Sequence, residues 1–204
     1  MIAIVDYGVG NLYSLCSSFK KIGAEAVIAS DKKIIENADK IILPGVGAFA
    51  DAAQKLRDTG LGELVKEQAK KGKYMMGICL GMQLLFEKSY EYGCHDGLGL
   101  LKGEVAPIKG FVAPDLKIPH IGWNGLRFTR PHFLFQYIKE GDHTYFVHSY
   151  HATNCADSVI ATTEYDKELT AAVGKENVLG CQFHPEKSGD VGLNILRAFI
   201  EKKD

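Results

Sequence analysis

The sequence lacks the cysteine patterns of a disulfide framework or a zinc site. The five cysteines are odd in number, scattered and never in a C-x-x-C pair: Cys16, Cys79, Cys94, Cys155 and Cys181. The seven histidines show no metal-ligand spacing either. We therefore expect neither a metal nor another cofactor, and this cysteine usage favours a cytoplasmic protein.

Long apolar runs and an excess of one charge are also missing. No uninterrupted apolar stretch reaches about 18 residues, and the opening apolar run breaks at Asp6 with no basic segment before it. The chain mixes 24 basic with 25 acidic residues, which leaves a net charge of −1. This balance predicts no membrane association and no nucleic-acid partner.

The apolar pattern of the first half predicts an α/β protein. Three short apolar runs alternate with helical patterns, in the order 2–5, 12–22, 41–43, 51–71, 74–78 and 80–86. Such alternation predicts βαβ units and a central, mostly parallel sheet flanked by helices. Ligands of such sheets bind outside the carboxyl ends of the strands, so the loops after each strand are the most informative.

The second half changes to closely spaced strand-like segments, which we interpret as an antiparallel extension of the same sheet. They lie at 104–108, 117–121, 144–150, 159–163, 170–173 and 178–183, and a final helix is expected over 191–202. No linker or repeat divides the 204 residues. We expect a single domain over 1–204.

Cys79 stands in a pattern typical of a reactive residue. The segment Gly77-Ile78-Cys79-Leu80-Gly81 has the glycine spacing of a nucleophile elbow, a sharp turn from strand to helix. The start of a helix favours a thiolate, and the Leu80 N–H would point at the site. The alternative is a small buried side chain, the more frequent fate of cysteine in an apolar segment. The motif alone leaves both open.

His184-Pro185-Glu186 supplies a candidate base and its partner. The residue before proline is extended, and positions i and i+2 of an extended chain project to the same side. Glu186 could therefore hold one ring nitrogen of His184 while the other faces a thiol. The alternative is a loop histidine beside an unrelated glutamate. Cys79 and this pair together favour a catalytic thiol.

The segment Pro44-Gly45-Val46-Gly47 follows the apolar run 41–43. Its backbone N–H groups could turn toward the neighbouring strand end and stabilise an oxyanion in acyl transfer. An ordinary glycine-rich turn is equally compatible with these four residues. A phosphate-binding P-loop is excluded, because no Gly-Lys-Ser/Thr follows.

Taken together, PGVGAF, GICLGMQLLF and FHPEKSG resemble the class I glutamine amidotransferases. In that family a Cys-His-Glu triad hydrolyses glutamine to glutamate and ammonia, on a flavodoxin-like fold. The segments DYGVGNLYS, IPHIGWN and YFVHSY, with the lysine after the triad glutamate, are more narrowly similar to the glutaminase subunits of imidazole glycerol phosphate synthase, in histidine biosynthesis. The resemblance covers essentially the whole chain.

The resemblance implies a role for particular residues. Cys79 would attack the glutamine amide, His184 would move protons and Glu186 would orient the imidazole. Backbone N–H groups of Leu80 and of Val46 or Gly47 would hold the oxyanion. The amino and carboxylate ends of L-glutamine would be held by Gln83, Glu91, Ser149 and Tyr150.

The resemblance also implies a partner. The family subunit docks on a (β/α)₈ cyclase as a one-to-one heterodimer, and ammonia passes to the cyclase, which makes imidazole glycerol phosphate and an aminoimidazole carboxamide ribonucleotide. Residues at that contact match Asn11, Trp123 and Lys187. We expect little glutaminase activity until the partner binds its substrate, because glycines beside Val46 permit a peptide flip at the oxyanion site.

Two positions depart from the family pattern. Lys102 stands where proline is expected, and His151 stands where an aromatic residue is more usual. They leave open a paralogue that supplies ammonia to another synthase, of the amino-sugar or pyridoxal phosphate type. A thiol hydrolase or peptidase on the same elbow, and a non-catalytic binding subunit, are the alternatives of other classes.

Overall fold

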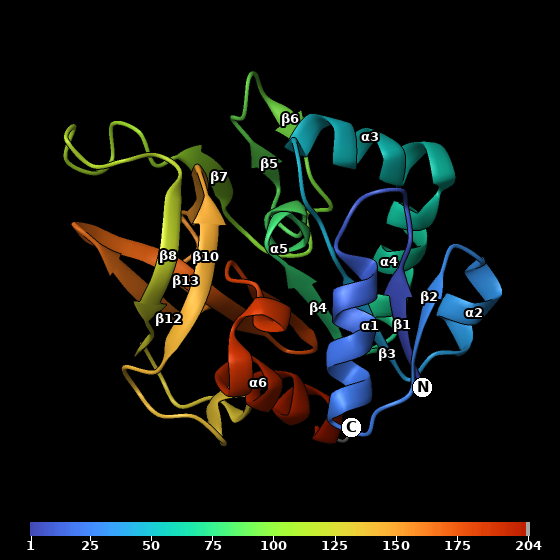
Figure 1. Ribbon diagram of the computed structural model, residues 1–204. Coiled ribbons are helices and arrows are strands. Elements are labelled where there is room, and N and C mark those ends of the chain that lie inside the picture. The colour runs from blue at the N-terminus through green and yellow to red at the C-terminus, as the bar shows by residue number, and fades with distance from the viewer. Residues whose placement is uncertain (203–204) are drawn as a thin grey trace.

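An eight-stranded sheet, in the order β2-β1-β3-β4-β14-β13-β12-β9, forms the centre of the fold (Figure 1). The computed structural model describes residues 1–202. Five strands are parallel: β1 (Ile2–Val5), β2 (Ala26–Ala29), β3 (Lys40–Leu43), β4 (Met75–Ile78) and β14 (Val178–Cys181). The antiparallel strands β13 (Lys167–Lys175), β12 (Val159–Tyr165) and β9 (Arg127–Phe128) continue the sheet.

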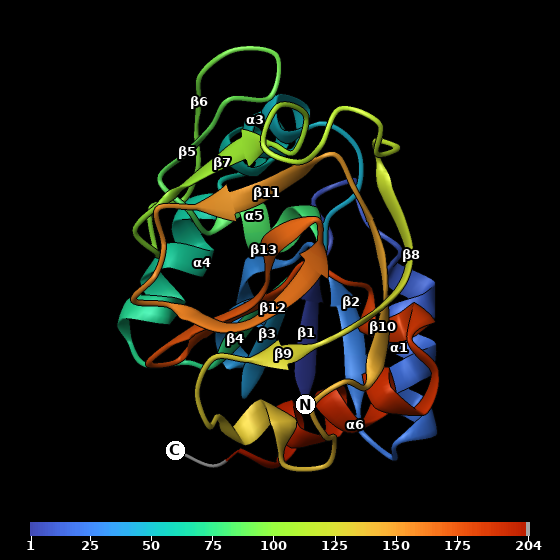
Figure 2. The same cartoon turned by 90° about the vertical axis from the view of Figure 1, so that its left-hand side faces the viewer.

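Helices cover both faces of this sheet. One face carries α1 (Leu12–Lys21) and α6 (Gly189–Glu201), and the other carries α2 (Lys32–Asn37), α3 (Phe49–Thr59), α4 (Leu61–Lys70) and α5 (Leu80–Leu84). Figure 2 shows α1 and α6 on one side of the strands and α4 on the other. Side chains alternate between the two cores, since Ile42 packs with α1 and α6 whereas Ile41 and Leu43 pack with α3 and α4.

The predicted helical region 51–71 is two helices. Gly60 adopts a left-handed conformation, with φ 68°, between α3 and α4. A single helix cannot pass through such a residue, and glycine adopts this conformation without steric cost. In the first half of the chain, β2 and α2 have no counterpart among the predicted segments. Both are short and mostly exposed or half-buried, so they carry little apolar periodicity.

The predicted antiparallel extension is only partly correct. Strands β12 and β13 do extend the main sheet, but six others form two separate small sheets. One contains β10 (His143–His148) and β8 (His120–Gly125), and the other contains β11 (Tyr150–Thr153), β7 (Glu104–Pro107), β5 (Lys88–Ser89) and β6 (His95–Asp96). The expected strand 144–150 thus divides at Ser149. Alternating apolar residues predict a strand but not the neighbour with which it pairs.

The pairing of β4 with β14 brings together two distant parts of the chain. Ile78 lies opposite Cys181, and the Cys79 N–H donates to the Cys181 carbonyl over 2.8 Å. The carboxyl ends of both strands therefore meet at one edge of the sheet, which is where ligands of such folds bind. No helix among residues 1–202 has the length and apolar character that a bilayer span requires.

Candidate active site

Cys79 lies in a strained turn between β4 and α5. Its backbone has φ 54° and ψ −112°, a region that non-glycine residues rarely adopt, and it is 8% exposed. The glycines beside it permit very close packing. A Cβ at Gly81 would lie 1.9 Å from the Leu43 carbonyl oxygen, and one at Gly77 would lie 2.5 Å from the Gly81 oxygen. At Gly77 and Gly81 the neighbouring backbone is therefore too close for any residue with a Cβ, and this packing fixes the turn that carries the thiol.

His184 and Glu186 form a buried pair at the end of β14. His184 Nδ1 lies 2.8 Å from Glu186 Oε1, and the two side chains are 3% and 1% exposed. The expected contact is present, although the reason given for it is only half correct. His184 is extended, with φ −99° and ψ 98°, but Glu186 lies in a 3₁₀ turn, η2 (Pro185–Lys187). This turn, rather than an extended strand, brings the carboxylate to the ring.

The other ring nitrogen of His184 faces the thiol. Burial lowers the pKa of His184, but hydrogen bonds to Cys79 and Glu186 and the charges of both groups outweigh burial and raise this pKa to about 9. Because Nδ1 is bound to Glu186, the hydrogen bond to Cys79 involves Nε2. At neutral pH the imidazole between the thiol and the carboxylate side chain is therefore protonated, and its position suits a base that serves a thiol nucleophile.

Gln182 contacts the thiol from a second direction and was not among the predicted site residues. Its Nε2 lies 3.6 Å from Cys79 Sγ, and its Oε1 accepts from Gln83 Nε2 over 2.9 Å. The side chain is completely buried. Its position two residues before His184, at the end of one strand, is the signal that could have identified it.

These residues line a cavity of about 310 Å³ at the carboxyl edge of the sheet. Nine predicted residues line it: Val46, Gly47, Cys79, Leu80, Gln83, Glu91, Ser149, Tyr150 and His184. Three that were not predicted complete the wall: Pro119, Val147 and His148. A larger open hollow of about 880 Å³ lies elsewhere, beside Lys71 and Asn177, and no cysteine, serine or threonine is among the residues that line it.

Two of the expected substrate contacts already have protein partners. Gln83 Nε2 donates to Gln182 and, over 3.1 Å, to the Tyr150 carbonyl oxygen, so only its Oε1 can still accept a donor. Glu91 Oε2 accepts from the Phe49 N–H over 2.5 Å at the start of α3. Glu91 also lines the cavity, so one carboxylate both caps a helix and forms part of the pocket wall.

The loop of Val46 and Gly47 is tied to the first loop of the chain. Gly47 has φ 92°, and Val46 is 41% exposed. The Tyr7 hydroxyl donates to the Pro44 carbonyl oxygen over 2.7 Å. Burial raises the pKa of Tyr7, and the nearby Cys79 raises it further, so the phenol stays protonated as a donor. Tyr7 was not predicted, although it belongs to the quoted segment DYGVGN.

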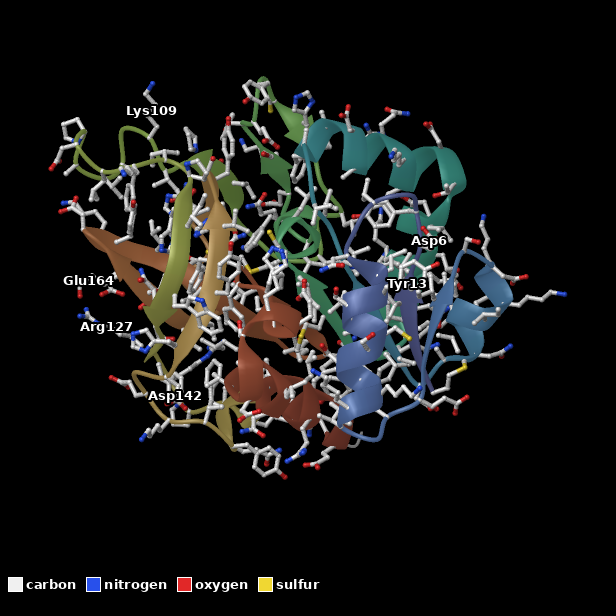
Figure 3. The ribbon with its side chains drawn as sticks, viewed as in Figure 1. Asp6, Tyr13, Lys109, Arg127, Asp142 and Glu164 are labelled. Atoms are coloured by element: carbon white, nitrogen blue, oxygen red, sulfur yellow. The ribbon has the colours of Figure 1, made fainter. Side chains whose placement is uncertain are left out.

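Two of the three expected partner-contact residues meet in one cluster. Trp123, which is 51% exposed, lies opposite Tyr145 in the β8–β10 pair, with 6.0 Å between ring centroids. Lys187 Nζ lies 5.7 Å from the centre of the same Tyr145 ring. Asn11 is the N-cap of α1, which packs against η2. Tyr13, exposed on the first turn of α1, is labelled in Figure 3.

Metal and disulfide chemistry have no structural counterpart in the described part of the chain. Within residues 1–202 no three His, Cys, Asp or Glu side chains are arranged to hold a metal ion. All five cysteines are free thiols. Cys181 is buried, and burial raises its pKa well above the ordinary value, as do the charges of Glu186 and Cys79. Cys79 is the one cysteine of the five that lines the 310 Å³ cavity.

Comparison with known proteins agrees with this geometry. The family model described as glutamine amidotransferase class-I matches residues 3–202. The imidazole glycerol phosphate synthase subunit HisH of Lactococcus lactis subsp. lactis is 50% identical over 98% of both chains. HisH of Sulfurimonas denitrificans is 51% identical and covers 100% of this chain and 99% of its own.

Among solved structures, a crystal structure of a glutamine amidotransferase superimposes with a TM-score of 0.77 at 20% identity, over 98% of both chains. That likeness concerns the fold alone, and it confirms the predicted fold class. The relatives confirm the resemblance inferred from the motifs. The chain therefore belongs to the class I glutamine amidotransferases, in the family of HisH subunits of imidazole glycerol phosphate synthase.

Proposed function

We propose that this glutamine amidotransferase hydrolyses L-glutamine with Cys79 as nucleophile, His184 as proton carrier and Glu186 as the group that orients the imidazole. The observation that carries the proposal is the strained Cys79 turn at the cavity, facing a histidine whose second nitrogen is 2.8 Å from a buried carboxylate. A thiol, a base and an orienting acid are the parts that nucleophilic acyl transfer needs.

The reaction proceeds in two halves. His184 holds the thiol proton while Cys79 Sγ forms a bond to the side-chain amide carbon of glutamine, and the electron pair of the C=O bond moves to oxygen. When the C–N bond breaks, the nitrogen takes the proton from His184 and leaves as ammonia. The remaining thioester is hydrolysed by water, which gives its proton to His184. The C–S bond then breaks, the product loses the remaining proton of that water to solvent and leaves as glutamate, and the thiolate and imidazolium are restored.

The surrounding groups hold the charges of this reaction. Backbone N–H groups of Leu80 and of Val46 or Gly47 stabilise the oxyanion, a contribution worth roughly 3 kcal/mol per donor in comparable enzymes. Gln83 and Glu91 present a carbonyl oxygen and a carboxylate to the α-ammonium group. The main chain at Ser149 and Tyr150 holds the rest of the amino-acid end. Every residue named in this paragraph lines the 310 Å³ cavity.

We further propose that the ammonia passes to a (β/α)₈ cyclase in a one-to-one heterodimer, for the synthesis of imidazole glycerol phosphate and aminoimidazole carboxamide ribonucleotide in histidine biosynthesis. The contact is built by Trp123 and Lys187, which meet on the Tyr145 ring, and by Asn11 at the start of α1. An exposed tryptophan beside an active site is typical of an interface anchor. A cytoplasmic location and a single domain over 1–204 stay predictions of the same kind.

The isolated subunit should hydrolyse glutamine slowly. Gly47 has φ 92°, and Val46 lies between it and Gly45, so the peptide that would supply an oxyanion donor sits in a segment that can change conformation. Binding of the substrate-loaded cyclase would select the productive arrangement. Full glutamine turnover by the subunit alone would contradict this part of the proposal.

Alkylation by a glutamine-mimicking diazo-ketone tests the chemistry directly. We expect one label per chain on Cys79, protection by glutamine, and no label in Cys79→Ala. Cys94→Ala, which removes an exposed thiol, is the matched control and should label as the unaltered protein does. Labelling that survives Cys79→Ala would refute the assignment of the nucleophile.

The acceptor is tested separately, by purification from the native source. A (β/α)₈ cyclase recovered in one-to-one ratio supports the proposed partner. Recovery of an amino-sugar or pyridoxal phosphate synthase would replace that partner while leaving the glutaminase chemistry intact.

A further inference from the structure

Three side chains outside the proposed triad form a continuous hydrogen-bonded chain that ends at the glutamine cavity. Asn124 Nδ2 lies 3.0 Å from His120 Nε2, and His120 Nδ1 lies 2.9 Å from His148 Nε2. His148 Nδ1 then lies 2.8 Å from the Tyr150 carbonyl oxygen. His148 and Tyr150 both line the cavity. We refer to Asn124, His120 and His148 as the imidazole relay.

The Tyr150 carbonyl oxygen, at the end of the imidazole relay, determines which ring nitrogen of each histidine carries the hydrogen. A carbonyl oxygen can only accept, so His148 must carry its hydrogen on Nδ1, and its Nε2 must accept. His120 must then donate from Nδ1 and accept at Nε2, where the Asn124 amide donates. The second amide hydrogen of Asn124 goes to the Glu164 carbonyl oxygen, 3.0 Å away, which determines the orientation of the amide. Only the neutral Nδ1–H form of both rings satisfies all four contacts.

The surroundings keep the rings of His120 and His148 neutral and hold them in place. His148 and His120 are 5% and 1% exposed, and burial lowers their pKa values to about 3 and about 4. The His120 ring lies between two aromatic rings, with centroids 5.1 Å from Phe146 and 4.3 Å from Tyr165. A second proton on either ring would place two donors face to face in the relay. Geometry and burial therefore favour the same protonation state.

The Tyr150 carbonyl oxygen is a junction between this relay and the substrate pocket. It accepts from His148 on one side and from Gln83 Nε2, over 3.1 Å, on the other. The Gln83 amide is therefore oriented by the same oxygen that the imidazole relay holds in place. Loss of the His148 hydrogen bond would therefore loosen the Ser149–Tyr150 segment and also the carbonyl oxygen to which Gln83 donates.

We propose that His120 and His148 are positioning residues for glutamine binding: in their neutral Nδ1–H forms they hold the Tyr150 carbonyl and, through it, the Gln83 side chain in the substrate-binding arrangement. This inference rests on the proposed function, because it assigns a purpose within the same pocket. Neither histidine touches the reacting atoms, so neither is a catalytic residue.

The far end of the imidazole relay is bonded to the main sheet. Asn124 follows the exposed Trp123 on β8, and its second bond reaches Glu164 at the end of β12. The side chain of Glu164 pairs with Arg127 at the outer edge of the main sheet, where Figure 3 labels both residues. The relay therefore joins the edge of the main sheet to the cavity through the small β8–β10 sheet.

The tautomers are the first test, because the hydrogen-bonded relay requires both Nδ1–H forms, whereas two histidines that merely pack through their rings do not. Nitrogen-15 spectra of the histidine-labelled full chain at neutral pH should show His120 and His148 as neutral rings with hydrogen on Nδ1. The exposed His143 supplies the reference signal of a solvated ring. A hydrogen on Nε2 of either ring, or a charged ring, overturns the proposal without any variant.

Two substitutions at one position give the second test. In His148→Asn the amide nitrogen takes the place of Nδ1 and can donate to the Tyr150 carbonyl, whereas His148→Leu has a similar branch point and no donor. The readouts are the half-saturation constant for diazo-ketone labelling and the rate of Cys79 alkylation by iodoacetamide, which needs no glutamine pocket.

We expect His148→Leu to raise the half-saturation constant about tenfold, the usual worth of one lost hydrogen bond, and His148→Asn to restore most of it. The iodoacetamide rate should change less than about twofold in both. Equal loss in both readouts indicates general loosening and overturns the proposal, as does no change in either. Absence of diazo-ketone labelling in the unaltered protein would instead refute the proposed function.

Discussion

Tyr7, in the loop after β1, donates a hydrogen bond to the carbonyl oxygen of Pro44, 2.7 Å away in the loop after β3. The tyrosine is 3% exposed, so this bond is protected from water. Pro44 precedes Gly45, where a Cβ would lie 2.6 Å from the Gly81 N–H nitrogen. The contact therefore holds the start of the proposed oxyanion loop against the turn that carries Cys79.

Removal of that hydroxyl should weaken glutamine hydrolysis without weakening glutamine binding. In Tyr7→Phe the Pro44 carbonyl loses a buried donor, at a cost of about 1 kcal/mol, and the loop that supplies an oxyanion donor becomes less well positioned. We expect kcat of the complex with the cyclase to fall about fivefold, with KM changed less than twofold. Steady-state glutaminase kinetics measure both.

Tyr13→Phe is the control for the Tyr7 substitution, because Tyr13 is 82% exposed. It should leave kcat unchanged. If the two variants behave alike, the Tyr7 hydroxyl has no role in positioning the loop.

The pKa of His184 predicts how stability depends on pH. Its folded pKa of about 9 lies above the ordinary value of 6.5, so its contribution is complete below about pH 6.5 and is lost as pH rises toward 9. Each pKa unit is worth about 1.4 kcal/mol, which makes the loss of order 3 kcal/mol across that window. Urea unfolding at pH 6.5 and 9 should show it.

His184→Asn removes the titrating group and should flatten that profile. Its free energy of unfolding should differ little between the two pH values, although Glu186 is left buried without its partner and the variant is less stable throughout. Parallel profiles for the variant and the unaltered protein would show that another group titrates in this window.

Alanine substitutions at Gly81 and Gly62 should differ in their effect on stability, because only Gly81 is closely packed against backbone. A Cβ at Gly81 would lie 1.9 Å from the Leu43 oxygen, whereas one at Gly62 in α4 meets its nearest atoms at 3.4 Å. Gly81→Ala should cost about 3 kcal/mol because the backbone must move. Gly62→Ala should change stability by less than about 1 kcal/mol, since alanine also favours helix. Thermal or urea unfolding compares them directly.

Truncation of Trp123 should weaken docking of the cyclase and leave the thiol chemistry intact. The indole is 51% exposed and packs edge-on against Tyr145, an arrangement typical of an interface anchor. We expect Trp123→Ala to cost about 2 kcal/mol of binding, or roughly 30-fold in Kd, by titration calorimetry.

Ile34→Ala, on α2, removes another exposed apolar side chain and serves as the control for Trp123. It should bind the cyclase normally. Comparable weakening by both substitutions would place the contact elsewhere or spread it over the surface.

The parts of the fold that were predicted from sequence are those with local signals. The runs at 2–5 and 41–43 are buried on both faces, so they stand out as short apolar strands, and the positions of Cys79, His184 and Glu186 follow from glycine and proline chemistry. The contact between His184 and Glu186 was predicted even though the 3₁₀ turn that makes it was not.

The parts that were not predicted depend on pairing between distant strands. His120 and His148 are adjacent only because β8 and β10 pair in one particular register, and alternation of apolar residues does not determine that register. Gln182 and Tyr7 were missed for a related reason. Each is an ordinary polar residue in its own segment and becomes part of the site only when neighbouring strand ends meet.

The central position of β14 also affects the order in which the site is assembled during synthesis. This last strand of the chain inserts between β4 and β13, and 103 positions separate Cys79 from Gln182. A ribosome needs roughly 5–20 s to add a segment of that length, at about 5–20 residues per second. Throughout that interval the thiol-bearing turn has neither its histidine nor its glutamine neighbour. A nascent or prematurely ended chain that stops before residue 184 therefore has the thiol but not the histidine–glutamate pair that faces it.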